Sequence, residues 1–159
     1  MPTLSPPLVL DAPLPATLAA MPFVEETRAL FRAVRDHDFD TLAALCDDDF
    51  GIVDLGPAGE SVPCRTRAEW ERWFRTLFAT LRAMDAATDT EIESYDALVR
   101  GELGYGVVEF TQLLTVGGLT GRFRCLVTII WKRAGERWVE SRWHCSLLGR
   151  DLPEGFPTA

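Results

Sequence analysis

The spacing of apolar residues changes near Thr88, and this change limits the possible fold more than any other feature of the sequence. Before Thr88, apolar residues recur every three or four positions, as on one face of a helix. After Thr88 they alternate with polar residues, as in strands that bury one face. We therefore expect helices in the first half and an antiparallel sheet in the second, an α+β domain. The helical stripes are Phe23, Thr27, Leu30, Phe31 and Val34, then Trp70, Trp73, Phe74, Leu77, Leu81 and Met84.

Local signals set the bounds of these elements. Pro22 suits the first turn of a helix, and Thr66-Arg67-Ala68-Glu69 is a capping box that begins another. Between them lie a short helix that Asp40 can cap and a short strand from Phe50 to Leu55. Long strands twist and curl, so we expect a cone-shaped, curved antiparallel sheet with three N-terminal helices packed on its concave face. The long strands are expected at about 88–99, 103–116, 119–133 and 136–148.

The chain length of 159 residues fits one domain. Residues 1–20 contain five prolines, and we expect them to form an extension without regular structure. Residues 21–150 are expected to form the cone domain, and residues 151–159 a tail.

Charge and composition argue against several classes of function. The net charge of −8 is unsuited to a nucleic-acid partner, which requires a basic surface. The four cysteines form no Cys-x-x-Cys pair and there are two histidines, so no metal site and no cofactor are expected. The apolar N-terminal stretch follows no Lys or Arg and is broken by prolines, which is atypical of a signal peptide or a membrane span. We therefore expect a cytoplasmic protein with reduced thiols and no membrane partner.

The turns predict which side chains share a face of the sheet. If Ala134-Gly135 is a two-residue turn, Trp131 opposes Trp138 and Cys125 opposes His144 on the concave face. Polar groups at such positions are less costly beside a cavity than in a dry core. The expected lining of this hollow is Arg142, His144, Ser146, Glu140, Gln112, Phe110, Trp131 and Trp138, with Trp70 at its edge.

An internal polar cluster is the alternative for this face. In that arrangement Glu140 would pair with Arg142 or with Asp54 and stabilise the cone. An error of one residue in the register would exchange the two faces of the sheet.

The convex face is expected to have charged ends and an apolar middle. An exposed apolar patch with a polar rim is typical of an interface. We therefore predict a homodimer through the outer sheet face, with Leu126, Ile130, Val139 and Trp143 at its centre.

Two stretches of the sequence have the pattern of a known superfamily. One runs from Leu42 to Gly59 and continues into the Thr66 helix, and the other is TIIWKRAGERWVESRWHCSLL, residues 128–148. Their order resembles the nuclear transport factor 2-like superfamily, and within it the SnoaL-like group. That group includes ketosteroid isomerases, polyketide cyclases and the association domain of calcium/calmodulin-dependent protein kinase II. The resemblance covers residues 22–149 and implies a cystatin-like cone fold.

The resemblance also implies candidate catalytic residues. The group typically ends its last strand with His-x-His-x-Ser, and here Arg142 replaces the first His while His144 and Ser146 match. Its isomerases place a general-base Asp at the end of the first strand, where this chain has Asp54. The alternative is that Asp54 caps the turn before Gly56-Pro57. The oxyanion Tyr of the isomerases has no counterpart in the matching stretch of the first helix.

Three functions remain open at this point. The chain could bind a small, largely apolar molecule in an enclosed pocket, with an anionic group held by Arg142. It could be an isomerase, cyclase or dehydratase in which Asp54 is the base and His144 the acid. It could also be a dimerisation or association module without catalysis. Whether the chain is an enzyme is left undecided by the sequence.

Overall fold

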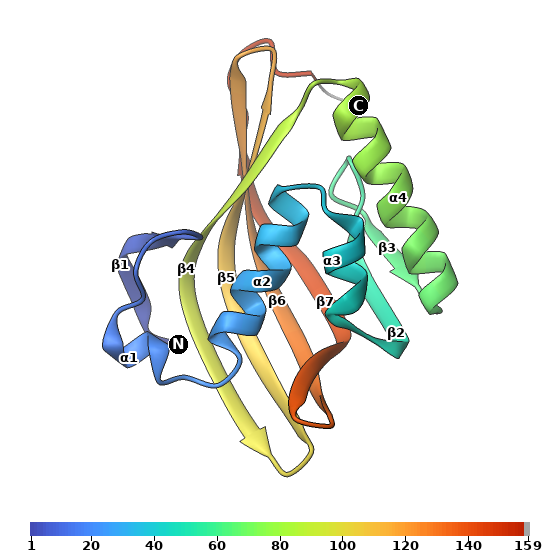
Figure 1. The fold of residues 1–159 in the computed structure, drawn as a ribbon. Helices are drawn as coiled ribbons and strands as arrows, with labels where there is room; N and C mark the ends of the chain where they lie inside the picture. The colour runs from blue at the N-terminus through green and yellow to red at the C-terminus, as the bar shows by residue number, and fades with distance from the viewer. Residues whose placement is uncertain (158–159) are drawn as a thin grey trace.

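The computed structural model of the chain describes residues 1–157 and contains one seven-stranded sheet with helices on one side (Figure 1). The helices are α1 (Ala16–Ala19), α2 (Val24–Arg35), α3 (Phe39–Ala44) and α4 (Arg67–Ala83). The strands are β1 (Thr3–Val9), β2 (Cys46–Leu55), β3 (Ser61–Cys64), β4 (Ala87–Arg100), β5 (Leu103–Val116), β6 (Leu119–Ala134) and β7 (Arg137–Asp151). None of the helices in these residues is long and apolar enough to cross a membrane.

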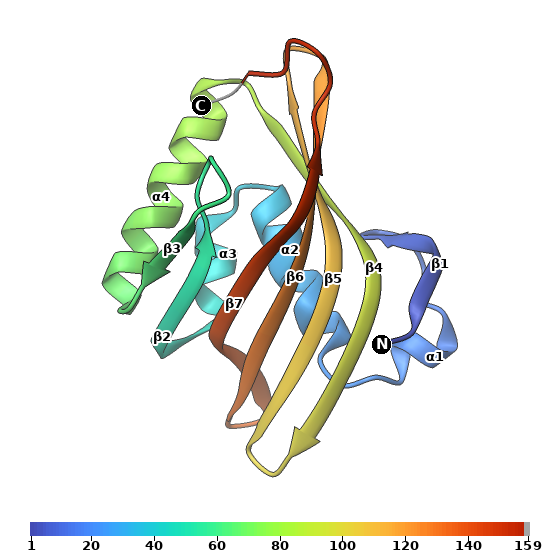
Figure 2. The same ribbon diagram turned by 180° about the vertical axis from the view of Figure 1, so that it is seen from behind.

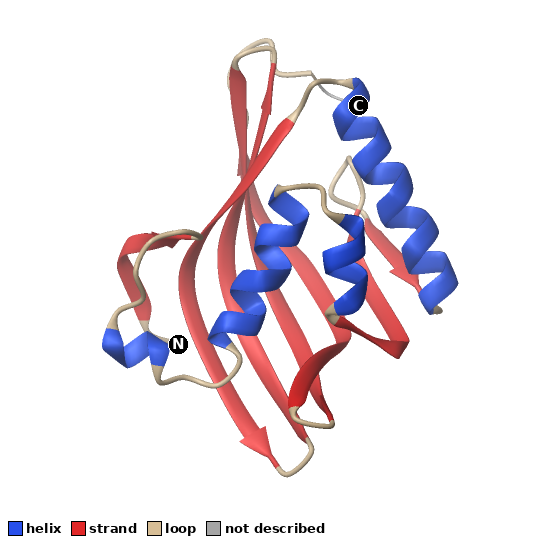
Figure 3. Ribbon diagram, viewed as in Figure 1, coloured by secondary structure: helices blue, strands red, loops and turns tan. Residues whose placement is uncertain are grey.

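The sheet has the order β1-β4-β5-β6-β7-β2-β3 and curls without closing. Its neighbours are antiparallel except for β2 and β7, which run parallel. Helices α2, α3 and α4 lie on the concave side (Figure 3), and the opposite side carries no helix over β5, β6 and β7 (Figure 2). The predicted α+β class, a curved sheet with helices on its concave face, is confirmed.

The long strands and most of their turns lie where the sequence predicted them. The turn Gly117-Gly118 has positive φ at both residues, 57° and 80°, as a two-residue hairpin turn requires. Val116 therefore opposes Leu119, as expected. Strong local turn chemistry explains why this part of the register could be derived from the sequence.

The predicted cap of α4 is present, and the predicted cap of α3 is wrong. The Thr66 hydroxyl accepts a hydrogen bond from the Glu69 backbone N–H at 3.2 Å, and the Glu69 carboxylate accepts one from the Arg65 N–H at 2.7 Å. For α3 the capping residue is Asp38, two positions before the expected Asp40. Its carboxylate accepts the backbone N–H of the third helical residue, which makes α3 begin earlier than expected.

The N-terminal segment has more regular structure than its prolines suggested. Thr3–Val9 form β1 on the free edge of β4, and Ala16–Ala19 form α1. Leu10 is 1% exposed, and its carbonyl accepts a hydrogen bond from the Arg28 guanidinium of α2 at 3.0 Å. The prediction of an extension without regular structure is therefore wrong, because an open sheet edge offers backbone partners even to a proline-rich strand.

Aromatic rings fill much of the space between the sheet and the helices. Phe23 stacks on Trp131 with ring centroids 5.5 Å apart, and Phe31 packs against Phe110 at 4.8 Å. Trp70 of α4 is buried in the same core. Phe110 and Trp131 lie on the concave face as predicted, but they contact other rings in the buried core. Burial of apolar surface at about 25 cal/mol per Å² makes this core the main source of stability.

A bulge in β7 changes which side chains face the helices. The β6–β7 turn lies at Gly135-Glu136, one residue later than predicted, so Trp131 pairs with Glu140 rather than with Trp138. This shift of two positions leaves Glu140 and Trp138 on the concave side. Ser141 is then an extra residue in β7, and beyond it the alternation of faces is reversed.

The reversal corrects the predicted composition of both faces. Beyond Ser141, three side chains that were expected inside lie on the convex face: Arg142, His144 and Ser146. Trp143 turns inward and packs against Phe31 at 6.0 Å, so it is not part of the outer patch. Val139 is 2% exposed and is buried within the chain itself. Of the four predicted interface residues, Leu126 and Ile130 remain on the convex face with partly exposed side chains.

Candidate functional site

The polar side chains predicted to line the hollow lie outside it. Arg142 pairs with Ile130 across the sheet and is exposed, and its guanidinium donates to the Asp49 carbonyl at 2.6 Å. His144 and Ser146 are exposed on the same convex face. The prediction that these three residues line the concave hollow is therefore wrong, because the bulge at Ser141 reverses their orientation.

Asp54 and His144 lie on opposite sides of the sheet. In the parallel pairing of β2 with β7, Val53 is opposite His144, so both point to the convex side. Asp54, the next residue, points to the concave side together with its β3 partner Val62. The predicted pairing of Asp54 as base with His144 as acid on one ligand is therefore wrong.

The remaining predicted lining residues are inside the fold but are already occupied. The Gln112 amide donates to the Asp89 carbonyl at 2.8 Å and accepts from the Thr90 hydroxyl at 3.2 Å. Trp138 packs edge-on against Phe23 at 5.0 Å. Trp70, Phe110 and Trp131 are buried in the core, so the contacts of this set of side chains stabilise the fold.

Asp54 is the predicted site residue whose surroundings remain suited to chemistry. It lies near the end of β2, deep in the fold, yet its surface is only partly buried. Burial raises the pKa of Asp54 to about 6, against weaker opposing hydrogen bonds from Leu55 and Trp143. The Leu55 backbone N–H donates to the carboxylate at 2.9 Å. The buried indole N–H of Trp143 forms no well-aligned hydrogen bond, so its contact with Asp54 is a weak one.

The Asp54 carboxylate acts through its charge on three buried thiols, and apolar groups lie beside it. Burial, followed by the charge of Asp54, raises the pKa of the Cys64 thiol. The Asp54 charge also disfavours ionisation of the Cys125 and Cys145 thiols. These two cysteines are neighbours on β6 and β7, and both are free and buried. The apolar border is partly exposed and includes Val62, which pairs with Asp54 across β2 and β3, and the Trp143 ring, whose indole contacts the carboxyl. Asp54 is thus a deep carboxyl group with an apolar border and some accessible surface.

Glu140 is a second carboxyl group on the concave side, and it is more deeply buried. It is 3% exposed and accepts a hydrogen bond from the Cys46 thiol at 3.4 Å. Burial raises the pKa of Glu140 to about 8, so the group is mostly neutral at pH 7. The expected pair of Glu140 with Arg142 is wrong, because Arg142 lies on the other face of the sheet. The negative charge of Asp54 contributes to raising the pKa of Glu140.

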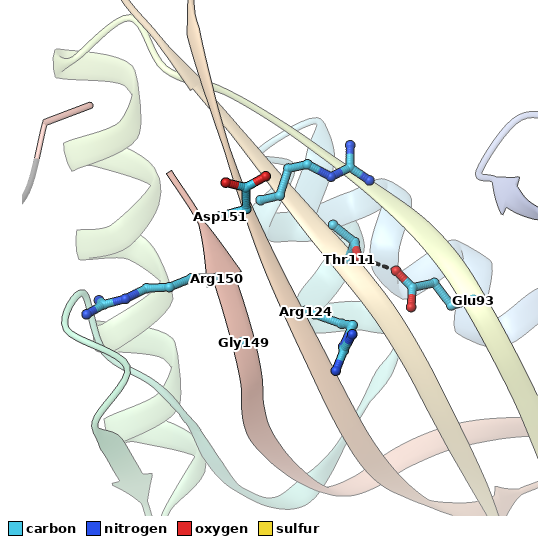
Figure 4. A pocket seen from close by; sticks show the side chains of 7 residues that line it. Glu93, Thr111, Arg124, Gly149, Arg150 and Asp151 are labelled. Carbon is cyan, nitrogen blue, oxygen red and sulfur yellow. Dashed lines mark hydrogen bonds between the residues drawn. The ribbon is translucent and has the colours of Figure 1, made fainter. Parts of the chain in front are cut away.

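Two open hollows are found on the described surface, and neither is an enclosed pocket. One, of about 350 Å³, lies on the convex face and extends from Glu93 of β4 and Thr111 of β5 to the start of β6 and the end of β7. Figure 4 shows it, with the Thr111 hydroxyl bonded to Glu93 and with Arg150 turned toward α4. The other, of about 360 Å³, lies between β3 and α4. The prediction of an enclosed pocket is therefore not confirmed. Residues 1–157 contain no cluster of three or more His, Cys, Asp or Glu side chains suited to a metal ion.

The sequence reasoning missed Trp143 and the thiols as neighbours of Asp54. Cys64, Cys125 and Cys145 come from three different strands, and no spacing in the sequence indicates that they meet. Trp143 was assigned to the convex face because nothing in the sequence marks Ser141 as a bulge. These residues could be found only from the pairing of β2 with β7 and of β7 with β6.

Residues 25–149 match the family described as the SnoaL-like domain. No curated protein has significant sequence similarity to the chain. Among solved structures, a type 2 hexachlorocyclohexane dehydrochlorinase is similar with a TM-score of 0.67 and 16% identity, over 91% of this chain and 93% of that one. An NTF2-like protein with a cystatin-like fold from Novosphingobium aromaticivorans has a TM-score of 0.62 and 16% identity, over 78% of each chain. A protein from the same organism, provisionally named a scytalone dehydratase, has a TM-score of 0.67 and 10% identity, over 82% of this chain and 84% of that one.

Proposed function

Because the chain belongs to the SnoaL-like domain family, we propose that it binds a small, largely apolar molecule beside Asp54. The observation that carries this proposal is a deep carboxyl group with accessible surface and an apolar border. Sites for small molecules combine apolar walls with a few polar groups that fix orientation. Asp54 and the indole N–H of Trp143 are polar groups of this kind.

The ligand is expected to be neutral rather than anionic. Asp54 is itself acidic, and Arg142, the cation expected to hold an anionic group of the ligand, lies on the convex face. An anionic group at this site would be repelled by the Asp54 carboxylate without a partner cation to offset the repulsion. A neutral molecule with one carbonyl or hydroxyl group fits the site better.

Proton transfer by Asp54 is a second candidate function, and the raised pKa favours it. With a pKa of about 6, the carboxyl is largely ionised at pH 7 and more basic than an ordinary aspartate. It could therefore take a proton from a bound molecule without His144. Two structurally similar proteins carry the names of a dehydrochlorinase and a dehydratase, which are reactions that remove a proton, and this supports the candidate.

We expect Asp54→Leu to weaken binding of a ligand that carries a hydroxyl group about tenfold, because the hydrogen bond that this hydroxyl donates to the Asp54 carboxylate is lost. The measurement is a thermal-shift titration with neutral ring compounds that carry one carbonyl or hydroxyl group. His144→Ala is the matched control and should bind like the wild type. For any compound found, solvent deuterium exchange at the carbon next to its carbonyl should rise with pH through about 6 and be lost in Asp54→Asn.

A panel without a binder, or a ligand that Asp54→Leu binds as well as the wild type does, would contradict the proposal of a site at Asp54. Normal binding without deuterium exchange would contradict proton transfer alone and leave a binding protein.

We also propose that the chain forms a homodimer through the convex face of the sheet. Val107, Leu126 and Ile130 are partly exposed there, without a covering helix. Charged pairs lie around them, including Arg124 with Glu109 at 3.6 Å. An apolar centre with a charged rim supports association between copies. This face is opposite Asp54, so ligand binding and dimerisation are compatible.

Ile130→Glu is expected to convert the dimer into a folded monomer, because it places a charge at the apolar centre of an interface of about 800 Å² per partner. Analytical ultracentrifugation measures the change. Ala79→Glu, on an exposed position of α4 away from this face, is the control and should remain dimeric. A wild type that sediments as a monomer would overturn the proposal, as would an Ile130→Glu variant that stays dimeric.

A further inference from the structure

A groove of about 360 Å³ runs between β3, the edge strand of the sheet, and α4. Asp54 does not line it, but Val62 and Cys64, which lie beside Asp54, do, so the groove adjoins the site proposed above and differs from it in its charged residues. Its volume lies within the range of about 300 to 1,000 Å³ that is typical of small-molecule sites.

The groove has an apolar floor with a flat aromatic surface. Val62 and Cys64 contribute from β3, and Trp73 contributes from α4. Trp73 is partly exposed, and its ring is held by an edge contact with Phe74 at 4.9 Å. An indole that is fixed in this way can stack on a planar ligand at little cost in side-chain entropy.

Two arginines stand on the rim of the groove without a carboxylate partner. Arg65 lies just before the start of α4. Arg72 is a residue of α4, next to Trp73 in the sequence, and lines the same groove. Both are exposed, and none of the ion pairs within residues 1–157 involves either guanidinium.

The other polar groups of the groove are already engaged. The Glu69 carboxylate accepts the backbone N–H of Arg65 at 2.7 Å, and the Thr76 hydroxyl donates to the Arg72 carbonyl at 2.9 Å. The donors that remain for a ligand are therefore the guanidinium groups. In a chain of net charge −8, this groove presents two cations against one carboxylate and is complementary to an anion.

From these contacts we propose that the groove binds a small aromatic carboxylate. The planar fork of Arg72 pairs with the two carboxylate oxygens, Arg65 adds a second positive charge, and the aromatic body lies on Trp73 and Val62. A peptide strand added to β3 fits less well. That strand is four residues long, and Pro63 lacks a backbone N–H for a further ladder.

The test uses 2-naphthoate and its neutral counterpart 2-naphthalenemethanol with the full chain. Two-dimensional ¹H–¹⁵N NMR resolves the indole N–H signals of the five tryptophans, and Trp73→Phe identifies the Trp73 signal. We expect 2-naphthoate to shift that signal saturably, and the neutral compound to bind at least about tenfold more weakly. Arg72→Gln should weaken 2-naphthoate binding about tenfold.

Arg100→Gln, which changes an exposed arginine at the β4–β5 turn, is the matched control and should bind 2-naphthoate like the wild type. The NMR spectrum of each variant also reports whether it is folded. The proposal is overturned if the Trp73 signal does not move, if both compounds bind equally, or if inorganic phosphate displaces 2-naphthoate at similar concentration. Asp54→Leu should leave this binding unchanged, so failure here is distinguishable from failure of the proposed function.

Discussion

Glu140→Gln is expected to stabilise the protein at alkaline pH by a few kcal/mol, with little effect near pH 5. The wild-type carboxyl has a pKa of about 8 in the fold, against 4.5 for an ordinary glutamate. The folded state therefore holds a proton that the unfolded state has released, and stability falls as pH rises from about 4.5 to about 8. Each unit of such a difference corresponds to about 1.4 kcal/mol. Glutamine has no proton to lose and can still accept the Cys46 thiol hydrogen bond.

Urea unfolding between pH 6.5 and pH 8, a range set by the Glu140 shift, measures this effect. Asp54, with a pKa raised to about 6, contributes a similar loss only at lower pH. Glu136→Gln is the control, because Glu136 is exposed in the β6–β7 turn and should not change the pH dependence. A Glu140→Gln variant with the wild-type slope would show that Glu140 is ionised in the fold at neutral pH.

Gly104→Ala is expected to destabilise the fold by about 1 to 3 kcal/mol or more, because its added methyl group has no space. A Cβ atom at this position would lie 2.7 Å from the Leu98 carbonyl oxygen and closer still to the Phe23 ring. Phe23 cannot move freely, since it stacks on Trp131 and contacts Trp138. The melting temperature and the urea midpoint should both fall.

Gly106→Ala is the matched control, two residues along the same strand and on the same face. A Cβ atom there would meet the Trp131 Nε1 at 3.5 Å and the Tyr95 hydroxyl at 3.6 Å, which are ordinary contacts. We expect its stability to stay within about 0.5 kcal/mol of the wild type or to rise slightly, because alanine restricts the unfolded chain. Equal effects of the two substitutions would contradict the close packing of Phe23 on Gly104.

The elements that could be predicted from the sequence are those that begin or end at a specific local motif. The α4 helix has its capping box at Thr66, and the β5–β6 hairpin has two glycines in a turn that needs positive φ. Both signals lie within a few neighbouring residues. The faces of β7 could not be predicted, because the Glu140-Ser141-Arg142 stretch has no glycine or proline to mark a bulge.

The candidate site was only partly accessible to sequence reasoning for the same physical reason. Asp54 could be identified from its position at the end of a predicted strand, because that position is a local property of the sequence. It remains a candidate site residue. The prediction that His144 and Arg142 line the site assumed regular alternation of side chains past Ser141. The bulge at Ser141 reverses that alternation, so the prediction failed. Partners such as Cys64 and Cys145 meet Asp54 through pairing between distant strands, which leaves no signature in the sequence.

The parallel pairing of β2 with β7 affects how the chain can be synthesised and folded. On the ribosome β2 emerges before β3, α4, β4, β5 and β6, whereas its partner β7 emerges after all of them. The edge of β2 that pairs with β7 therefore has no strand partner until β7 has been synthesised. Contacts between such distant segments close large loops and slow folding. An unpaired strand edge of this kind can associate with other chains until β7 pairs with it.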